Sequence, residues 1–266
     1  MKRFFICYLW IFFWSFSFFG QVQNVDSKVF TFDVPAPQFQ KPRKIWIYLP
    51  QNYEATSQKY PVIYMLDGQN LFDNQTAFAG EWQIDESLDQ LKAKVIIVGI
   101  EHGNDLRLSE LTPFSNEKYG GGSADLFLDF IIQNLKPQID SKFRTKTNSK
   151  NTAIFGSSLG GLFAYYAVVK HPEVFSKAGV FSPSFWFSNQ IYELTEHAPK
   201  IKAKIYLLCG DNESPDMVNE VNKMNYLLNV NRCSCLKLTK KVIVKNGQHN
   251  EKLWREQFQN AYLWLF

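Results

Sequence analysis

Ser158 lies at the centre of the segment "GSSLG", residues 156–160, which fits the pattern Gly-x-Ser-x-Gly. This pattern typically holds a serine nucleophile on a sharp turn between a strand and a helix, where bulky neighbours would keep the two elements apart. An apolar run, "TAIF", precedes the segment, and the helix-like run "LGGLFAYYAVVKH" follows it. The pentapeptide alone is also compatible with a glycine-rich packing turn, but this context favours covalent catalysis by Ser158.

A serine nucleophile needs a general base, and in this kind of site the base follows the acid late in the chain. The candidate bases are the four histidines, His102, His171, His197 and His249. His249 follows the last expected strand and precedes the final expected helix, which is the required position. The other three fit surface, helix-end or strand-end positions, with His102 also a candidate pocket residue. We therefore predict His249 as the base.

The acid and the oxyanion donors are less well defined by the residues themselves. The loop after "KIYLLCG" offers three carboxylates, Asp211, Glu213 and Asp216, and spacing does not choose among them. The amide of Leu159, at the start of a helix, and that of Gln69, in "MLDGQNLF", are the candidate oxyanion donors. Gly68 is expected to let this second backbone segment approach the substrate; a plain Asp-Gly turn is the alternative.

Strand-like and helix-like segments alternate along the chain, which predicts an α/β fold with a mostly parallel sheet and helices on both faces. The runs "KVFTFDV" and "RKIWIYLP" alternate in polarity and are expected to form an antiparallel N-terminal edge. Continuous apolar runs such as "VIYML" are typical of buried central strands. The segment 106–123 lacks periodicity and is expected to cross the surface as an irregular loop.

The N-terminus has the layout of a secretory signal peptide. Lys2 and Arg3 precede an apolar run, and no further charge occurs before Asp26. We therefore expect a signal peptide over residues 1–20, a single catalytic domain over 21–266, and export to the periplasm or the medium. Retention of the run as a short membrane anchor is the alternative.

Composition narrows the possible partners. The chain has 266 residues, of which 45% are hydrophobic, enough for one large core. Its 29 basic and 25 acidic residues are mixed along the sequence and give no argument for nucleic acid as a partner. Cys209, Cys233 and Cys235 remain after signal removal, and we interpret them as ordinary thiols with at most one bridge. No metal site is expected, since no nearby histidine completes one.

Several segments together resemble the "putative esterase" family of α/β-hydrolases, which includes esterase D, feruloyl and acetylxylan esterases, enterochelin-type siderophore esterases and mycolyltransferases. The matching segments, in chain order, are "VIYMLDGQNLF", "EWQIDE", "RLSELTP", "FGSSLGGLFAYYAVVKHPEVFSKAGVFSPSFW", "LLCGDNES" and "GQHNEKLW". The resemblance implies an α/β-hydrolase fold with Ser158 as nucleophile, His249 as base, and the amides of Gln69 and Leu159 as oxyanion hole. It also implies Glu213 as the acid, with Asp211 as fallback.

The resemblance further implies roles for three tryptophans. Trp82 and Trp186 match aromatic residues near the substrate, and Trp254 matches the last residue of a His-x-Glu-x-x-Trp pattern. Each of them is equally compatible with a place in the core.

These expectations describe an exported serine esterase that hydrolyses a small-molecule or carbohydrate-linked carboxylic ester without a metal or organic cofactor. Two alternatives remain at this point: an acyltransferase that uses a sugar or lipid alcohol in place of water, and an inactive binding protein on the same fold. The acyl and alcohol parts of the substrate and the oligomeric state are left open.

Overall fold

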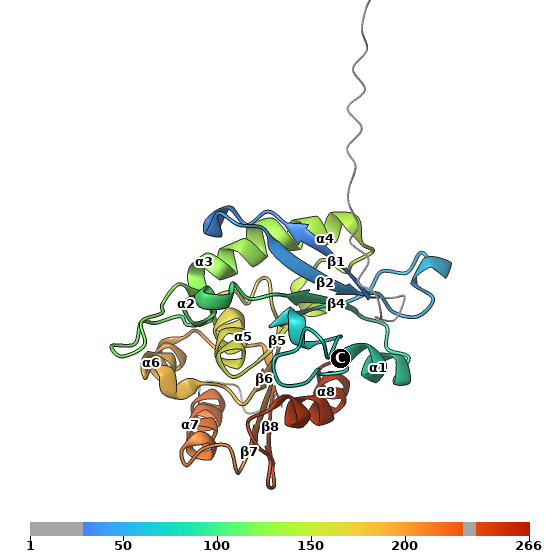
Figure 1. Ribbon diagram of the computed structural model, residues 1–266. Coiled ribbons are helices and arrows are strands. Elements are labelled where there is room, and N and C mark those ends of the chain that lie inside the picture. Colours follow the sequence, from blue (N-terminus) through green and yellow to red (C-terminus); the bar gives the residue numbers. More distant parts are fainter. Residues whose placement is uncertain (1–28, 231–237) are drawn as a thin grey trace, which may run out of the picture.

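The computed structural model describes residues 29–230 and 238–266. This part of the chain forms an eight-stranded sheet with helices on both faces (Figure 1). The strands are β1 (Val29–Val34), β2 (Arg43–Tyr48), β3 (Val62–Leu66), β4 (Ile96–Ile100), β5 (Thr152–Ser157), β6 (Lys177–Phe181), β7 (Lys204–Gly210) and β8 (Thr239–Val244). Their spatial order is β1-β2-β4-β3-β5-β6-β7-β8.

The strand directions confirm the expected mostly parallel sheet with an antiparallel N-terminal edge. β1 pairs antiparallel with β2, and β2 pairs antiparallel with β4. The other neighbours, from β4 through β3 to β8, are parallel. Every residue of β3 is buried, as its continuous apolar sequence requires, because helices cover both faces of the sheet there. The carboxyl ends of the parallel strands therefore meet at one edge.

The helices divide into two layers. They are α1 (Ile84–Gln90), α2 (Arg107–Leu111), α3 (Ala124–Asp129), α4 (Lys136–Lys142), α5 (Leu159–Lys170), α6 (Gln190–His197), α7 (Met217–Val230) and α8 (Glu251–Leu265). Buried residues of α2 to α7 share one apolar core, and those of α1 and α8 share the other. Figure 1 shows these two groups on opposite sides of the sheet.

Two helices set the geometry at the carboxyl edge of the sheet. α5 directly follows β5 and is buried on nearly all sides, so its first residues are fixed against β5 and β6. α8 begins after Asn250, whose side chain accepts a hydrogen bond from the amide of Leu253 at 3.1 Å. This N-cap fixes the point where the loop containing His249 ends.

The segment 106–123 is more ordered than the sequence predicts. It contains α2, which packs against α3 and α5, and the Ser109 and Ser123 hydroxyls at its two ends are 2.8 Å apart. A helix of five residues is too short to give a clear periodic signal, which explains why the pattern indicated only a loop. A π-helical turn, Phe130–Leu135, joins α3 to α4.

Several expectations fall on residues that the structure does not describe. The expected signal peptide, residues 1–20, and both Cys233 and Cys235 lie outside the described ranges. Cys209 is a free thiol in the core, and burial raises its pKa to about 12. None of the helices in the described ranges is long and apolar enough to cross a bilayer.

Candidate active site

Ser158 occupies a strained turn between β5 and α5. Its backbone has φ 57° and ψ −123°, a left-handed conformation that costs a non-glycine residue about 1–3 kcal/mol. Two backbone hydrogen bonds of 3.0 Å hold the turn, from the Ser158 amide to the Phe181 carbonyl and from the Ser184 amide to the Ser158 carbonyl. The turn thus presents the Ser158 side chain at the edge where the parallel strands end.

The glycines around Ser158 are required by close approach of the backbone, as the sequence predicts. A Cβ atom on Gly156 would collide with the backbone of Gly160. A Cβ atom on Gly161 would lie 2.7 Å from the carbonyl oxygen of Phe181, on the neighbouring strand. The small residues therefore let β5, α5 and β6 converge at the serine.

We expect Gly156→Ala to destabilise the fold by about 1–3 kcal/mol, because the added methyl group meets rigid backbone rather than a movable side chain. This corresponds to a fall in Tm of about 3–10 °C, which thermal unfolding followed by circular dichroism would measure. Ser157→Ala is the matched control, since it adds no volume in the same turn. A Gly156→Ala protein as stable as this control would show that the turn can expand.

His249 and Glu213 come together across the end of the sheet. His249 Nδ1 lies 2.7 Å from Glu213 Oε2, and the side chain of Glu213 is 0% exposed. Glu213 Oε1 accepts hydrogen bonds from Ser182 Oγ at 2.7 Å and from the amide of Gly210 at 2.5 Å. Both carboxylate oxygens of Glu213 are thus in contact with protein groups. Its contact with Nδ1 orients the imidazole and leaves Nε2 as the second ring nitrogen.

The Ser182 hydroxyl is itself positioned by a hydrogen bond from Trp254. Trp254 Nε1 donates a hydrogen bond of 2.8 Å to Ser182 Oγ, and the Trp254 ring makes an edge contact with His249 at 5.2 Å. Ser182 also has a left-handed backbone, with φ 43°. Trp254 and Ser182 therefore position both members of the His249–Glu213 pair.

The other candidate acids lie elsewhere. Asp211 Oδ1 accepts a hydrogen bond of 2.6 Å from the amide of Asn246, so this side chain stabilises the turn after β8. Asp216 is exposed just before α7. Of the three carboxylates that the sequence left open, Glu213 is the one that contacts His249.

The segment after β3 forms the second wall of the site. Asp67 has a left-handed backbone with φ 56°, and its carboxylate accepts two hydrogen bonds from Arg107, at 2.7 and 2.8 Å. Burial acts to lower the pKa of Arg107, but the charge of Asp67 and this contact outweigh it, so the pKa is raised. The ion pair fixes Asp67 at the start of the turn that carries Gln69.

Gly68 packs closely on β4. A Cβ atom on Gly68 would lie 2.7 Å from backbone atoms of both Gly99 and Ile100, so the glycine permits this packing, while its expected approach to a substrate stays a prediction. Within the described ranges, the amides of Gln69 and Leu159 donate no hydrogen bond to the protein. Their neighbours Asn70 and Ser158 line the cavity described next, although Gln69 and Leu159 themselves are not among its lining residues.

A cavity of about 450 Å³ lies beside the residues predicted to act as nucleophile and base. Ser158 and His249 both line it, and so do Asp67, Arg107 and Glu251. The Ser158 hydroxyl lies 3.3 Å from Ser184 Oγ, and no hydrogen bond joins it to His249 in the described structure. Such contacts commonly tighten only when substrate binds.

Of the remaining histidines, His171 and His197 lie away from this cavity, whereas His102 lies in its lining. His102 lines the same cavity, and burial lowers its pKa, which favours a neutral ring. His171 contacts Glu173 at 2.7 Å, and His197 contacts the carbonyl of Glu193 at 2.8 Å. The latter two have local partners at the ends of their own helices.

The two tryptophans expected near the substrate do not line the cavity. Trp82 is 3% exposed and stacks on Phe181, with ring centroids 5.6 Å apart; it also packs against Trp254. Trp186 is 52% exposed and packs against Tyr119. Trp82 thus packs against Trp254, the aromatic residue that contacts His249. Trp186 lies on the surface and is not part of the cavity lining.

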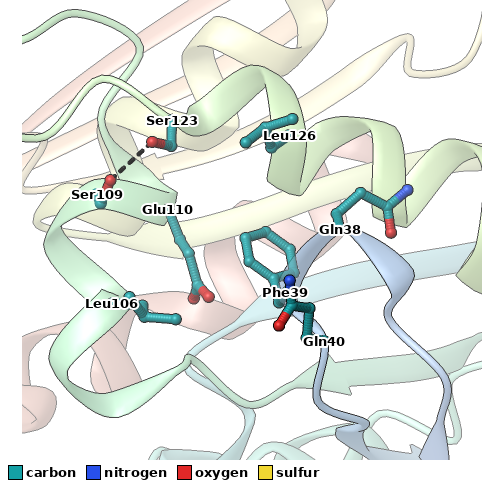
Figure 2. Close-up of a pocket in the computed structure, with 8 residues that line it drawn as sticks. All are labelled: Gln38, Phe39, Gln40, Leu106, Ser109, Glu110, Ser123 and Leu126. Carbon is teal, nitrogen blue, oxygen red and sulfur yellow. Dashed lines mark hydrogen bonds between the residues drawn. The ribbon is translucent and has the colours of Figure 1, made fainter.

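A second hollow, of about 280 Å³, lies between the β1–β2 connection and α2 and α3 (Figure 2). Figure 2 shows Phe39 between Glu110 on one side and Leu126 on the other. Glu110 is already paired with Arg43 at 2.5 Å. Since no histidine lines this hollow beside Ser109, the cavity with Ser158 is the candidate active site.

Sequence reasoning missed three residues of the site. Ser182 and Arg107 stand within the segments "SPS" and "RLSELTP" that carry the resemblance, so a signal was present for both. For Phe78, which lines the cavity, the sequence contained no such signal. It lies in the polar segment "DNQTAFAG", where a lone aromatic residue indicates no particular role.

Comparison with known sequences identifies the family. Residues 36–265 match the model of the family described as "Putative esterase". The chain is 28% identical over 244 residues to the uncharacterized protein YbbA of Bacillus subtilis, covering 84% of this chain and 92% of YbbA. It is 28% identical over 184 residues to the endo-1,4-beta-xylanase/feruloyl esterase of Xylanibacter ruminicola, covering 65% of this chain but 23% of that protein. The ferri-bacillibactin esterase BesA of Bacillus subtilis is 29% identical over 161 residues, with 54% and 55% covered.

Solved structures agree on the fold. The BES protein of Bacillus cereus has a TM-score of 0.73 at 24% identity, covering 94% of this chain and 98% of that one. The enterobactin esterase FES of Shigella flexneri, in the presence of enterobactin, has a TM-score of 0.74 at 19% identity, covering 91% and 60%. These likenesses establish the α/β-hydrolase fold. The match to the family model over residues 36–265 shows that the chain belongs to the "Putative esterase" family, which supports ester hydrolysis as its activity.

Proposed function

We propose that this protein is a serine carboxylic ester hydrolase that works through an acyl-enzyme on Ser158. The observation that carries the proposal is the contact of 2.7 Å between His249 Nδ1 and the buried Glu213, beside a cavity that Ser158 also lines. Acyl transfer requires a nucleophile, a base and an acid that orients the base, and the candidates for all three lie at the carboxyl edge of the sheet.

In the first step, His249 Nε2 takes the proton of the Ser158 hydroxyl as Oγ attacks the ester carbonyl carbon. Negative charge develops on the carbonyl oxygen, and the amides of Gln69 and Leu159 donate hydrogen bonds to it. When the carbonyl re-forms, the bond to the alcohol oxygen breaks, and the proton on His249 passes to the leaving alcohol. The products are a free alcohol and an acyl-Ser158 ester.

In the second step, water replaces the alcohol. His249 takes a proton from the water as its oxygen attacks the acyl carbon, and the same two amides stabilise the second oxyanion. Collapse releases the carboxylic acid and returns the proton to Ser158. Glu213 remains ionised throughout and stabilises the imidazolium that forms in each step.

The relatives suggest where to look for the substrate. They include proteins named as a feruloyl esterase and as siderophore esterases. We infer a small-molecule or carbohydrate-linked ester as substrate. From the signal-like residues 1–20 we also infer that the domain over 21–266 acts after export.

A fluorophosphonate probe tests the proposal directly, because an activated serine displaces its fluoride and becomes phosphonylated. We expect the wild-type protein to be labelled at Ser158 and His249→Ala to lose at least about 90% of the labelling rate, since the base is gone. His197→Ala is the matched control, because its ring contacts only the Glu193 carbonyl on the surface of α6. Equal labelling of both variants, or no labelling of the wild type, would refute an activated serine.

A further inference from the structure

Phe78 is an exposed aromatic residue at the mouth of the candidate active site. Its side chain is 91% exposed, yet it lines the same cavity as Ser158 and His249. A single exposed apolar side chain is ordinary on a protein surface. One at the mouth of a cavity that contains a nucleophile offers apolar area that a ligand can bury.

The segment that carries Phe78 is held rigidly. The amide of Phe78 donates to Asn70 Oδ1 at 3.0 Å, and Thr76 Oγ1 donates to the carbonyl of Gln69 at 2.7 Å. The amide of Trp82 donates to the carbonyl of Asn70 at 2.8 Å. The backbone of Phe78 is therefore tied to the turn that supplies the Gln69 amide, which places this residue beside the proposed oxyanion hole.

A second aromatic ring belongs to the same cavity. Trp254 lines it and is fixed by its hydrogen bond to Ser182 and its edge contact with His249. The cavity volume of about 450 Å³ falls within the range of about 300–1,000 Å³ that small-molecule sites occupy. Two aromatic residues in the lining of a site of this size favour a flat, apolar ligand, because aromatic rings attract one another in stacked and edge-on arrangements.

The charged side chains of the lining disfavour anions. Asp67 and Glu251 are acidic, and Arg107 is the only lysine or arginine among the lining residues. Two donor groups of Arg107 are already bound to Asp67. Partial burial lowers the pKa of His102, which favours the neutral form of its ring. The lining is therefore neutral to acidic, and a substrate with a negative charge near it would be repelled.

We propose that Phe78 is a specificity-determining residue that packs against an uncharged aromatic acyl group, so that this site selects neutral aromatic esters over anionic ones. This inference rests on the proposed esterase activity and narrows its substrate class. The acyl carbon then lies at Ser158 while the ring of the acyl group extends toward the cavity mouth. Esters whose acyl group is too small to reach Phe78 lose this contact.

Three p-nitrophenyl esters with the same leaving group test the inference: the acetate, the benzoate and the para-carboxybenzoate. We expect Phe78→Ala to lower kcat/KM for the benzoate about tenfold, which is the size of one lost aromatic contact. The acetate should change less than about twofold, because it does not reach the ring. Phe78→Tyr should restore the benzoate rate, and Tyr226→Ala, an exposed aromatic position on α7, is the matched control.

The preference for uncharged over anionic esters is measured separately. The wild-type protein should prefer the benzoate to the para-carboxybenzoate by at least about tenfold, and Glu251→Gln should reduce this preference, since it removes one negative charge from the lining. Equal effects of Phe78→Ala on acetate and benzoate, no effect on either, or a preference for the carboxylated ester would overturn the inference. Failure of the esterase proposal looks different: the wild-type protein would hydrolyse none of the three esters and would take up no fluorophosphonate.

Discussion

Replacing Ser158 by alanine is expected to lower kcat for p-nitrophenyl acetate by at least about 1,000-fold, because it removes the hydroxyl that is proposed to form the acyl-enzyme. The fold should persist. Alanine is smaller than serine, and the backbone hydrogen bonds that hold the turn come from the amide and carbonyl of residue 158, not from its side chain. Initial rates of p-nitrophenol release, with thermal unfolding as a check on the fold, measure both quantities.

Ser157→Ala is the control for this experiment. Ser157 precedes Ser158, is buried, and lines the same cavity. Its loss should change kcat less than about threefold, as expected of a side chain with no part in covalent catalysis. Retention of most of the activity in Ser158→Ala would refute the mechanism, provided that a mock purification from cells without the gene shows no esterase.

The second large effect is expected at Glu213. We expect Glu213→Gln to lower kcat about 100- to 10,000-fold, because an amide does not stabilise the imidazolium and allows the wrong orientation of the ring. The substitution also introduces an NH₂ group where Ser182 and the Gly210 amide now donate to a carboxylate oxygen. KM should change much less than kcat, since Glu213 is shielded from the cavity by His249.

Asp211→Asn and Asp216→Asn are the matched controls, since they make the same chemical change in the same loop. Asp211 holds the amide of Asn246, so its loss should lower thermal stability slightly while kcat stays within about threefold of the wild-type value. A loss of kcat in Asp211→Asn that equals the loss in Glu213→Gln would contradict the assignment of the acid.

The fold was predictable because its signals are long and redundant. The apolar run that became β3 is too continuous for a half-exposed strand, and the alternating runs of β1 and β2 are typical of a sheet edge. The sequence predicts the helix after Ser158 equally clearly. By contrast, α2 is only five residues long, so its existence depends on packing against α3 and α5, which no local pattern records.

The site was only partly predictable, for a related reason. Ser158 and His249 stand at fixed places relative to strands and helices, so the order of elements points to them. The proposed acid lies in a loop with three carboxylates, and only the three-dimensional path of that loop brings Glu213 to His249 and turns Asp211 toward Asn246. The ion pair between Asp67 and Arg107 is hidden for the same reason: forty residues separate its members.

Asp67, Ser158 and Ser182 all have left-handed backbones, and they stand at the ends of three neighbouring strands, β3, β5 and β6. At about 1–3 kcal/mol each, these conformations together use a substantial part of the 5–15 kcal/mol by which folded domains exceed their unfolded state. Evolution toward a new substrate would have to alter loops at this same edge, and most substitutions destabilise. Lineages of this protein should therefore acquire compensating mutations in the two apolar cores before or alongside any change of specificity.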